Sequence, residues 1–259
     1  MESEILPIIS IKNLKKSYGD KQVLKSINLE IYPGQVIGYI GPNGAGKSTT
    51  VKVLTGLISD FEGEVLMYNQ SIKEDVVAIK SQIGYVPENA EIYEVLTPLE
   101  YLDFVGKLYG MEEDAIADRA MKLLTAFGIG SNADQRMDTF SKGMRQKVLL
   151  ISGIIHNPKI IILDEPLSGL DANAVIMVKE LIALLAKEGK TIFYCSHMMD
   201  VVEKVSDRIL LIANGEIIAD GSFEDLKAGG NQTLESIFAK LTGKEESNKE
   251  ANDVLNALS

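Results

Sequence analysis

Short apolar runs separated by turn residues dominate the first part of the chain. β-Branched residues in runs of this length predict strands, and the dipeptides Gly19-Asp20 and Pro33-Gly34 predict turns between them. After the third run the pattern changes to that of a helix, which we expect over Lys47–Leu57. The strands expected here are Ile8–Asn13, Val23–Ile31, Gln35–Ile40 and Gly63–Met67.

The middle of the chain, about residues 88–155, spaces its apolar residues in a helical pattern. Thr97 is suited to cap a helix that begins at Pro98, and Glu100 would complete a capping box. This stretch therefore predicts a helical subdomain inserted into a larger domain. The first expected helix has Thr97 as its N-cap, the second begins near Glu112 and the third begins at Ser141. A strand over Gln82–Val86 precedes them.

Strands and helices alternate again from Lys159 onward. The apolar run Ile160–Leu163 is typical of a parallel strand buried on both faces, and Asn214-Gly215 predicts a hairpin turn. We expect an α/β domain with a mixed or parallel sheet over residues 1–243, and a polar tail over residues 244–259. We also expect helices over Asn173–Lys187, Met198–Val205 and Leu234–Leu241, a strand over Thr191–Cys195 and a hairpin over Ile209–Ala219.

The charge balance narrows the possible partners. The chain has 26 Lys and Arg against 37 Asp and Glu, a formal net charge of −11, which argues against nucleic acid or an anionic bilayer as a direct partner. Cys195 is the single cysteine and cannot form an internal disulfide. The start, Met1–Ile9, lacks the basic residues of a secretory signal, and no apolar run is long enough to span a membrane. We therefore expect a soluble, cytoplasmic protein.

The strongest motif is a glycine-rich loop at residues 41–48, which matches the pattern G-x-x-x-x-G-K-[ST] between an expected strand and an expected helix. Glycines allow backbone N–H groups to turn toward an anion, and the helix N-terminus adds partial positive charge. Lys47 would reach the β- and γ-phosphates of a nucleotide, and Ser48 would bind Mg²⁺. The expected nucleotide-binding residues are Gly41, Pro42, Asn43, Gly44, Ala45, Gly46, Lys47, Ser48 and Thr49.

A second motif follows the apolar strand Ile160–Leu163, where Asp164 and Glu165 stand side by side. The strand places Asp164 at the carboxyl edge of the sheet, beside the glycine-rich loop. In P-loop ATPases an aspartate at this place supports Mg²⁺. Glu165 would orient or deprotonate the attacking water. The two motifs together predict a P-loop NTPase core.

With these motifs in this order, residues 8–241 resemble the nucleotide-binding subunit of an ATP-binding cassette (ABC) transporter. Tyr18 lies where that family has an aromatic residue that stacks on adenine. Residues 141–146 stand at the family signature, and residues 168–171 match its D-loop. His197 matches the switch histidine. The resemblance implies an N-terminal antiparallel β-subdomain beside the P-loop core, with ATP and Mg²⁺ as ligands.

The resemblance also implies how the protein works. Two subunits, identical or homologous, would form a head-to-tail dimer with ATP, in which Ser141, Gly143 and Asp171 of one contact the nucleotide of the other. The helical region would dock a separate transmembrane permease, so the chain would lie on the cytoplasmic face of the membrane and reach it only through the permease. The residues expected to act in catalysis are Lys47, Glu165 and His197.

Two places depart from the family pattern. Glu88 stands where the family usually has a glutamine that touches Mg²⁺; its carboxylate can also supply an oxygen, so Ser48, Asp164 and Glu88 are the expected metal ligands. Lys142 and Met144 replace a glycine and a glutamine of the signature. This form of the signature resembles the ATPase subunits of two-component exporters.

Two other functions stay open on the sequence alone. A soluble ABC ATPase acting on ribosomes or DNA is disfavoured by the single cassette and the acidic charge. A regulatory ATP-binding module without hydrolysis is suggested by Glu88 and the altered signature. Against it, the chain carries Lys47, Asp164, Glu165 and His197.

Overall fold

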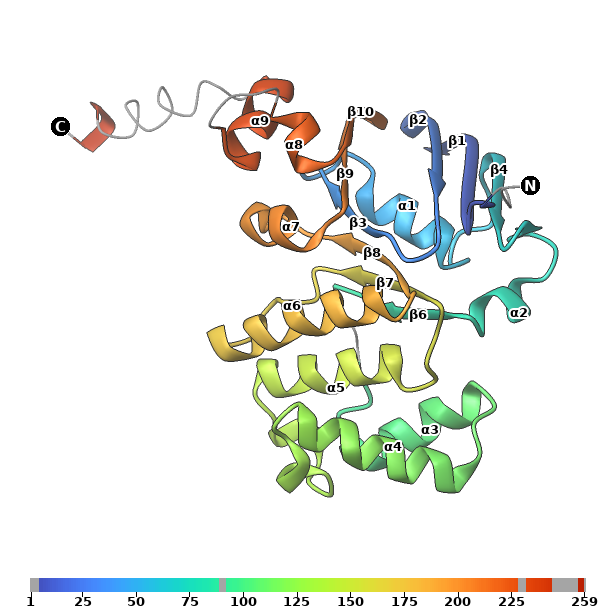
Figure 1. Ribbon diagram of the computed structural model, residues 1–259, viewed down its shortest axis with the longest axis vertical. Coiled ribbons are helices and arrows are strands. Elements are labelled where there is room, and N and C mark those ends of the chain that lie inside the picture. The colour runs from blue at the N-terminus through green and yellow to red at the C-terminus, as the bar shows by residue number, and fades with distance from the viewer. Residues whose placement is uncertain (1–4, 89–91, 228–231, 244–255, 259) are drawn as a thin grey trace.

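The computed structural model describes residues 5–88, 92–227, 232–243 and 256–258 (Figure 1). Within these residues, six strands form a central sheet with the order β10-β9-β3-β8-β7-β6. All of its neighbouring pairs are parallel except β10 with β9. The predicted mixed, mainly parallel sheet is therefore confirmed. Its strands are β3 (Val36–Ile40), β6 (Ile83–Val86), β7 (Ile160–Asp164), β8 (Thr191–Cys195), β9 (Arg208–Ala213) and β10 (Glu216–Gly221).

A smaller antiparallel sheet with the order β2-β1-β4-β5 is the expected N-terminal β-subdomain. In its register, Ile9 lies opposite Ile31 on one neighbour and Met67 on the other. All three side chains are fully buried, so this face of the sheet belongs to the core. Its strands are β1 (Ile9–Tyr18), β2 (Lys21–Ile31), β4 (Glu62–Met67) and β5 (Gln70–Ser71).

Helices separate and cover the sheets. In Figure 1, α1 lies between the central and antiparallel sheets, whereas α3 and α4 form the layer farthest from the antiparallel sheet, with α5 next to them. The helices are α1 (Lys47–Leu54), α2 (Val76–Lys80), α3 (Pro98–Leu108), α4 (Glu113–Ala126), α5 (Lys142–Ile154), α6 (Ala172–Lys187), α7 (Met199–Val205), α8 (Phe223–Leu226) and α9 (Leu234–Leu241).

Two apolar clusters fill the two faces of the central sheet. Successive side chains of a strand point to opposite faces. In β7, Ile161 and Leu163 therefore belong to the cluster on the helical side, and Ile160 and Ile162 belong to the cluster shared with the antiparallel sheet. Burial on both faces is why β7 is a continuous apolar run. The run ends in Asp164 at the carboxyl edge of the sheet.

Local signals account for several element ends. The predicted capping box is confirmed: Thr97 Oγ1 accepts from the Glu100 N–H, and Glu100 Oε2 accepts from the Thr97 N–H. The predicted hairpin turn is also confirmed, because Asn214 and Gly215 both have positive φ, at 50° and 79°. The helix α9 spans residues 234–241, as predicted.

Other features differ from the prediction. β1 continues to Tyr18 instead of ending at Asn13, because pairing with β2 resumes after the irregularity at Asn13, where φ is 52°. α1 ends at Leu54, three residues before the predicted end at Leu57, with Thr55 as its C-cap. The short elements β5, α2 and α8 were not expected.

Two further findings concern membrane spans and the C-terminal residues. Among the residues that the structure describes, no helix is long and apolar enough to cross a membrane. Most of the predicted polar tail, residues 244–255 and 259, lies outside the described residues, whereas residues 256–258 are helical.

Candidate functional site

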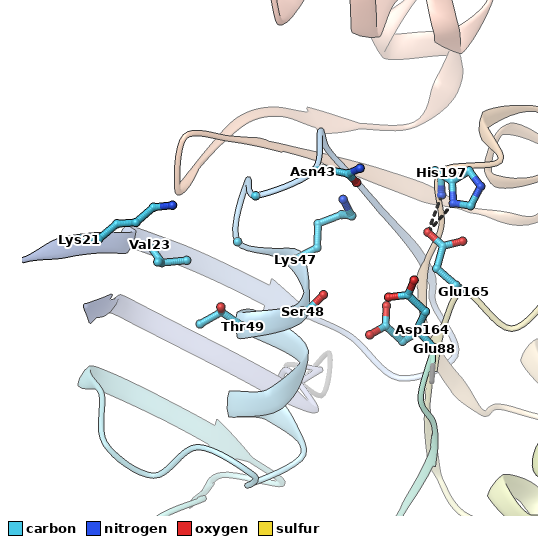
Figure 2. Close-up of a pocket in the computed structure, with 12 residues that line it drawn as sticks. Lys21, Val23, Asn43, Lys47, Ser48, Thr49, Glu88, Asp164, Glu165 and His197 are labelled. Atoms are coloured by element: carbon cyan, nitrogen blue, oxygen red, sulfur yellow. Dashed lines mark hydrogen bonds and ion pairs between the residues drawn. The ribbon is translucent and has the colours of Figure 1, made fainter. Parts of the chain in front are cut away.

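A pocket of about 520 Å³ opens at the carboxyl edge of the central sheet (Figure 2). This is the edge at which parallel α/β sheets carry their ligand sites. The glycine-rich loop and the first turn of α1 form one side, and the segments that follow β6, β7 and β8 form the other. The lining residues are Lys21, Val23, Asn43, Gly44, Gly46, Lys47, Ser48, Thr49, Glu88, Asp164, Glu165 and His197.

The backbone of the loop depends on its glycines. Gly46 has a φ of 115°, and a Cβ at this position would lie 2.6 Å from Leu24 Cδ2. A Cβ on Gly41 would overlap the carbonyl oxygen of Ile212. Gly46 is also the N-cap of α1, and a glycine has no side chain with which to cap that helix end. The first N–H groups of α1 are therefore available to an anion, whose charge the helix N-terminus favours.

Lys47 folds back over its own loop. Its Nζ donates to the carbonyl oxygens of Gly41, at 2.6 Å, and Pro42, at 3.2 Å. A phosphate would be a stronger acceptor than these neutral carbonyls, because both partners of the new bond would be charged. The Lys47 side chain therefore lies at the pocket and can exchange these carbonyl oxygens for a phosphate. The loop residues Gly41, Pro42 and Ala45 support the loop and are not among the residues that line the pocket.

Three carboxylates meet across the pocket from the loop. Asp164 is 6% exposed, and Glu88 and Glu165 line the same pocket. Burial and, after it, the negative charges of Glu88 and Glu165 raise the pKa of the Asp164 carboxyl to about 6, although the Lys47 ammonium opposes the rise. A bound cation would relieve this repulsion.

The oxygen donors at this edge fit Mg²⁺. The Ser48 hydroxyl and the carboxylates of Asp164 and Glu88 are hard ligands of the kind that Mg²⁺ prefers. In nucleotide sites, Mg²⁺ usually takes one or two protein carboxylates, and waters and phosphate oxygens complete its shell. In the described part of the chain, no group of three His, Cys, Asp or Glu side chains forms a metal site.

Glu165 is held by the segment that follows β8. Its Oε2 accepts from Ser196 Oγ at 3.1 Å, and its Oε1 accepts from the His197 N–H at 2.9 Å. His197 Nδ1 lies 2.8 Å from the same Oε1 (Figure 2). Glu165 also has a φ of 49°, which is rare for a residue with a Cβ. The carboxylate therefore has a defined direction at the pocket, while the His197 side chain is 75% exposed and open to a ligand.

Besides three residues of the glycine-rich loop, four predicted nucleotide contacts from other parts of the chain do not line the pocket. Tyr18 is 50% exposed at the end of β1. Ser141 and Asp171 are the N-caps of α5 and α6, each accepting a backbone N–H from its own helix. Gly143 lies against the carbonyl oxygen of Gly169. The described chain does not bring these residues to its own glycine-rich loop, so their nucleotide contacts stay predictions.

The sequence reasoning missed three residues of the site. Lys21 and Val23 line the pocket from the start of β2. They follow the predicted turn after Tyr18, so the hairpin places them next to a position that the sequence had already singled out. Ser196 directly precedes His197, but a serine in that position gives no sign of its contact with Glu165.

Sequence comparisons identify related proteins. The ABC transporter family profile matches residues 24–168, a range that includes the glycine-rich loop and Asp164–Glu165. The linearmycin resistance ATP-binding protein LnrL of Bacillus subtilis is 35% identical over 230 residues, which cover 88% of this chain and 74% of LnrL. The Nod factor export ATP-binding protein I of Cupriavidus metallidurans is 33% identical over 219 residues, 85% of this chain and 72% of the relative.

Solved structures share the fold. The structure described as the ATP binding subunit of an ABC transporter has a TM-score of 0.85 and 28% identity, and covers 91% of this chain and 99% of its own. The dimeric post-hydrolysis structure of the ATP-binding cassette MJ0796, bound to ADP and Pi, has a TM-score of 0.76 and 27% identity over 83% of this chain and 98% of its own.

Proposed function

We propose that this chain, which belongs to the ABC transporter family as an ATP-hydrolysing motor subunit, energises export through a separate membrane permease. The names of two relatives support the direction, since one is a linearmycin resistance ATP-binding protein and the other is a Nod factor export ATP-binding protein. The observation that carries the proposal is the pocket in which the glycine-rich loop faces Asp164 and Glu165. A phosphate-binding loop and an acid pair for metal and water are the two halves of an ATP-hydrolysing site.

ATP would bind with its phosphates along the loop. The first N–H groups of α1, which have no partner within the helix, would surround the β- and γ-phosphates. Lys47 would leave the two loop carbonyls for these phosphates, because a bond between two charged groups is stronger than one from an ammonium to a neutral carbonyl. Lys21 and Val23 line the other end of the pocket. Tyr18, just before them in the hairpin, would stack on the adenine.

Ser48 and Asp164 would hold Mg²⁺, and Glu88 is positioned to add a further oxygen. When bound, Mg²⁺ would neutralise charge on the phosphates and on the transferring phosphoryl group. Burial, and after it the negative charges of Glu88 and Glu165, raise the pKa of Asp164, and the repulsion among these carboxylates supports a cation at this place. Replacing either Ser48 or Asp164 should therefore weaken nucleotide binding in the presence of Mg²⁺ more than in its absence.

Glu165 would orient the attacking water and accept its proton. The bonds that its carboxylate accepts from Ser196 Oγ and from the His197 N–H fix its direction at the pocket. The exposed His197 ring would contact the γ-phosphate from the same side. Catalysis would consist mainly of positioning and charge stabilisation, as in other phosphoryl transfers.

A second subunit, identical or homologous, would complete each site. Ser141 and Gly143 lie at the N-terminus of α5, where a partial positive charge favours phosphate, and Asp171 lies at the N-terminus of α6. These residues are remote from the pocket of their own chain. The related MJ0796 cassette is dimeric with ADP and Pi. We infer a head-to-tail dimer that closes with ATP and reopens after hydrolysis.

The permease would dock on the helical side of the molecule. Tyr93, Leu96, Glu100 and Phe104 line an apolar groove of about 400 Å³. The rings of Tyr93 and Phe104 pack edge to face, with centroids 5.8 Å apart, and are 59% and 42% exposed. Exposed aromatic residues of this kind are common anchors in protein interfaces. The chain would thus reach the cytoplasmic face of the membrane only through the permease, without binding nucleic acid.

Two measurements test the proposal. In the first, ATP turnover of the purified chain is compared with that of Glu165→Gln, which should lower kcat at least about 100-fold. In the second, the tagged chain is extracted from membranes in mild detergent. It should retain an integral membrane protein that Phe104→Glu loses. Met121→Glu should keep that protein, because Met121 is a similarly exposed residue, at 41%, on α4. Turnover unchanged in Glu165→Gln, or retention by Phe104→Glu, would contradict the proposal.

A further inference from the structure

The segment that follows Glu165 is held by α5. Gln146 Nε2 donates to the carbonyl oxygen of Pro166 at 2.9 Å, and Gln146 is 7% exposed. Proline has no N–H, so its carbonyl is the only backbone hydrogen-bonding group that Pro166 offers. Gln146 takes that group. The residue next to Glu165 is therefore tied to α5 by a buried hydrogen bond.

Two further contacts join the start of α5 to the same segment. Lys142 Nζ donates to Ser168 Oγ at 3.0 Å. Gly143 and Gly169 touch so closely that a Cβ on Gly143 would lie 2.8 Å from the Gly169 carbonyl oxygen. A Cβ on Gly169 would lie 2.9 Å from the Lys142 side chain. The segment 166–171 thus packs against α5 along most of its length.

Glu165 needs support of this kind. Its φ of 49° is unfavourable for a residue with a Cβ, so it persists only where the surroundings hold it. On one side its N–H donates to the Cys195 carbonyl at 2.9 Å. On the other side its carbonyl accepts from the Ser168 N–H at 3.2 Å, within the segment that α5 holds.

We propose that Gln146, assisted by Lys142, is a positioning residue for Glu165. Gln146 is not among the residues that line the nucleotide pocket and acts through Pro166. By fixing the Pro166 carbonyl, it fixes the backbone of Glu165 and so the direction of the carboxylate toward the attacking water. The inference rests on the proposed function, because it assumes that Glu165 handles that water. Gln146 would thus affect hydrolysis only through the backbone next to Glu165.

Gln146→Met tests the inference, since methionine keeps the length and loses the N–H donor. It should lower kcat about tenfold, because small displacements of a catalytic group cost that much or more. KM for ATP should stay within about twofold, because the glycine-rich loop is untouched. Gln82→Met is the matched control: Gln82 also donates its side-chain amide to a backbone carbonyl, that of Ala78, away from Glu165. It should keep the wild-type kcat.

A double variant separates positioning from general damage. Adding Gln146→Met to Glu165→Gln should lower the residual turnover no further, because Gln146 acts through the Glu165 carboxylate. If Gln146→Met keeps the wild-type kcat, or if its loss is equally large in the Glu165→Gln background, the inference is wrong. If Gln146→Met does not fold, the exposed Lys142 replaces it in the test. Lys142→Met should lower kcat about twofold to threefold, and Lys142→Arg, which keeps the donor, should restore it.

Hydrogen exchange distinguishes a failure of this inference from a failure of the proposed function. The amide of Ser168, which bonds to Glu165, should exchange at least about tenfold faster in Gln146→Met than in wild type or Gln82→Met. This readout does not need turnover. If the wild-type chain shows no ATP turnover that Glu165→Gln removes, the proposed function is wrong. Unchanged exchange at Ser168 overturns the positioning role whatever the turnover is.

Discussion

Asp164→Asn should stabilise the fold while it destroys activity. The pKa of Asp164 lies at about 6 instead of 3.8, because burial and the charges of Glu88 and Glu165 disfavour its ionised form. At about 1.4 kcal/mol per pKa unit, the ionised carboxylate lowers the free energy of unfolding at pH 7 by at most about 3 kcal/mol. Solvent in the open pocket screens part of this cost, which leaves about 1–2 kcal/mol. An asparagine carries no charge and avoids that cost.

The sign of the effect fixes its pH dependence. Below pH 3.8 the carboxyl is protonated in both the folded and the unfolded chain, so the charge costs nothing. As pH rises through about 6, the folded chain must ionise Asp164 against its surroundings, and the full cost appears. The advantage of Asp164→Asn in the free energy of unfolding should therefore grow from near zero at about pH 4 to about 1–2 kcal/mol at pH 7.

Urea unfolding without nucleotide and with a chelator measures this difference at both pH values. Asp134→Asn, at an exposed aspartate, is the control and should show no such trend. In the presence of Mg²⁺ and ATP the order should reverse, because only the wild type gains the binding energy of the metal complex. An Asp164→Asn protein that is less stable than wild type at pH 7, or equally favoured at pH 4 and pH 7, would refute the reasoning.

Three further predictions concern the loop and the helical side. Gly46→Ala forces a Cβ into a φ of 115° and against Leu24, so ATP affinity in a fluorescent-nucleotide titration should fall at least about tenfold; unchanged affinity would contradict the loop geometry. Lys47→Met should weaken ATP binding about 10- to 100-fold in the same assay, through loss of a charge-assisted bond. The His156 ring stacks on Tyr109, and burial lowers its pKa from 6.5 to about 4. Between these pH values His156 is therefore protonated in the unfolded chain but not in the folded chain, which destabilises the fold as pH falls. In urea unfolding, the free energy of unfolding should fall from pH 7 to pH 5 by about 1 kcal/mol less in His156→Phe than in the wild type. An equal fall in the two proteins would refute this.

The sequence predicted those parts of the fold that depend on short-range signals. The apolar run before Asp164, the capping box at Thr97 and the Asn214-Gly215 turn each act within a few residues, and each is present in the structure. The glycine-rich loop belongs to the same class, because its spacing alone specifies the nest and the helix start. Their physical causes are local, so a single sequence contains them.

Long-range contacts were not predictable in this way. The bond from Gln146 to Pro166 joins residues 20 positions apart, and only the tertiary structure, which places α5 beside the segment after β7, brings them together. Lys142, interpreted from the sequence as a change in the signature, instead bonds Ser168 of its own chain. The extension of β1 beyond Asn13 likewise depends on pairing with β2, which overrides the weak strand propensity of that residue.

Nucleotide-dependent dimerisation of Glu165→Gln tests the central claim, a motor whose ATP sites are shared between two subunits. Light scattering would compare this variant with ATP–Mg²⁺, with ADP and without nucleotide, with Gly143→Arg added as the interface control. The account predicts a dimer with ATP–Mg²⁺ only, and a monomer when Gly143→Arg blocks the end of α5. A protein that binds ATP and stays monomeric, or that dimerises equally with ADP or with Gly143→Arg, would contradict it.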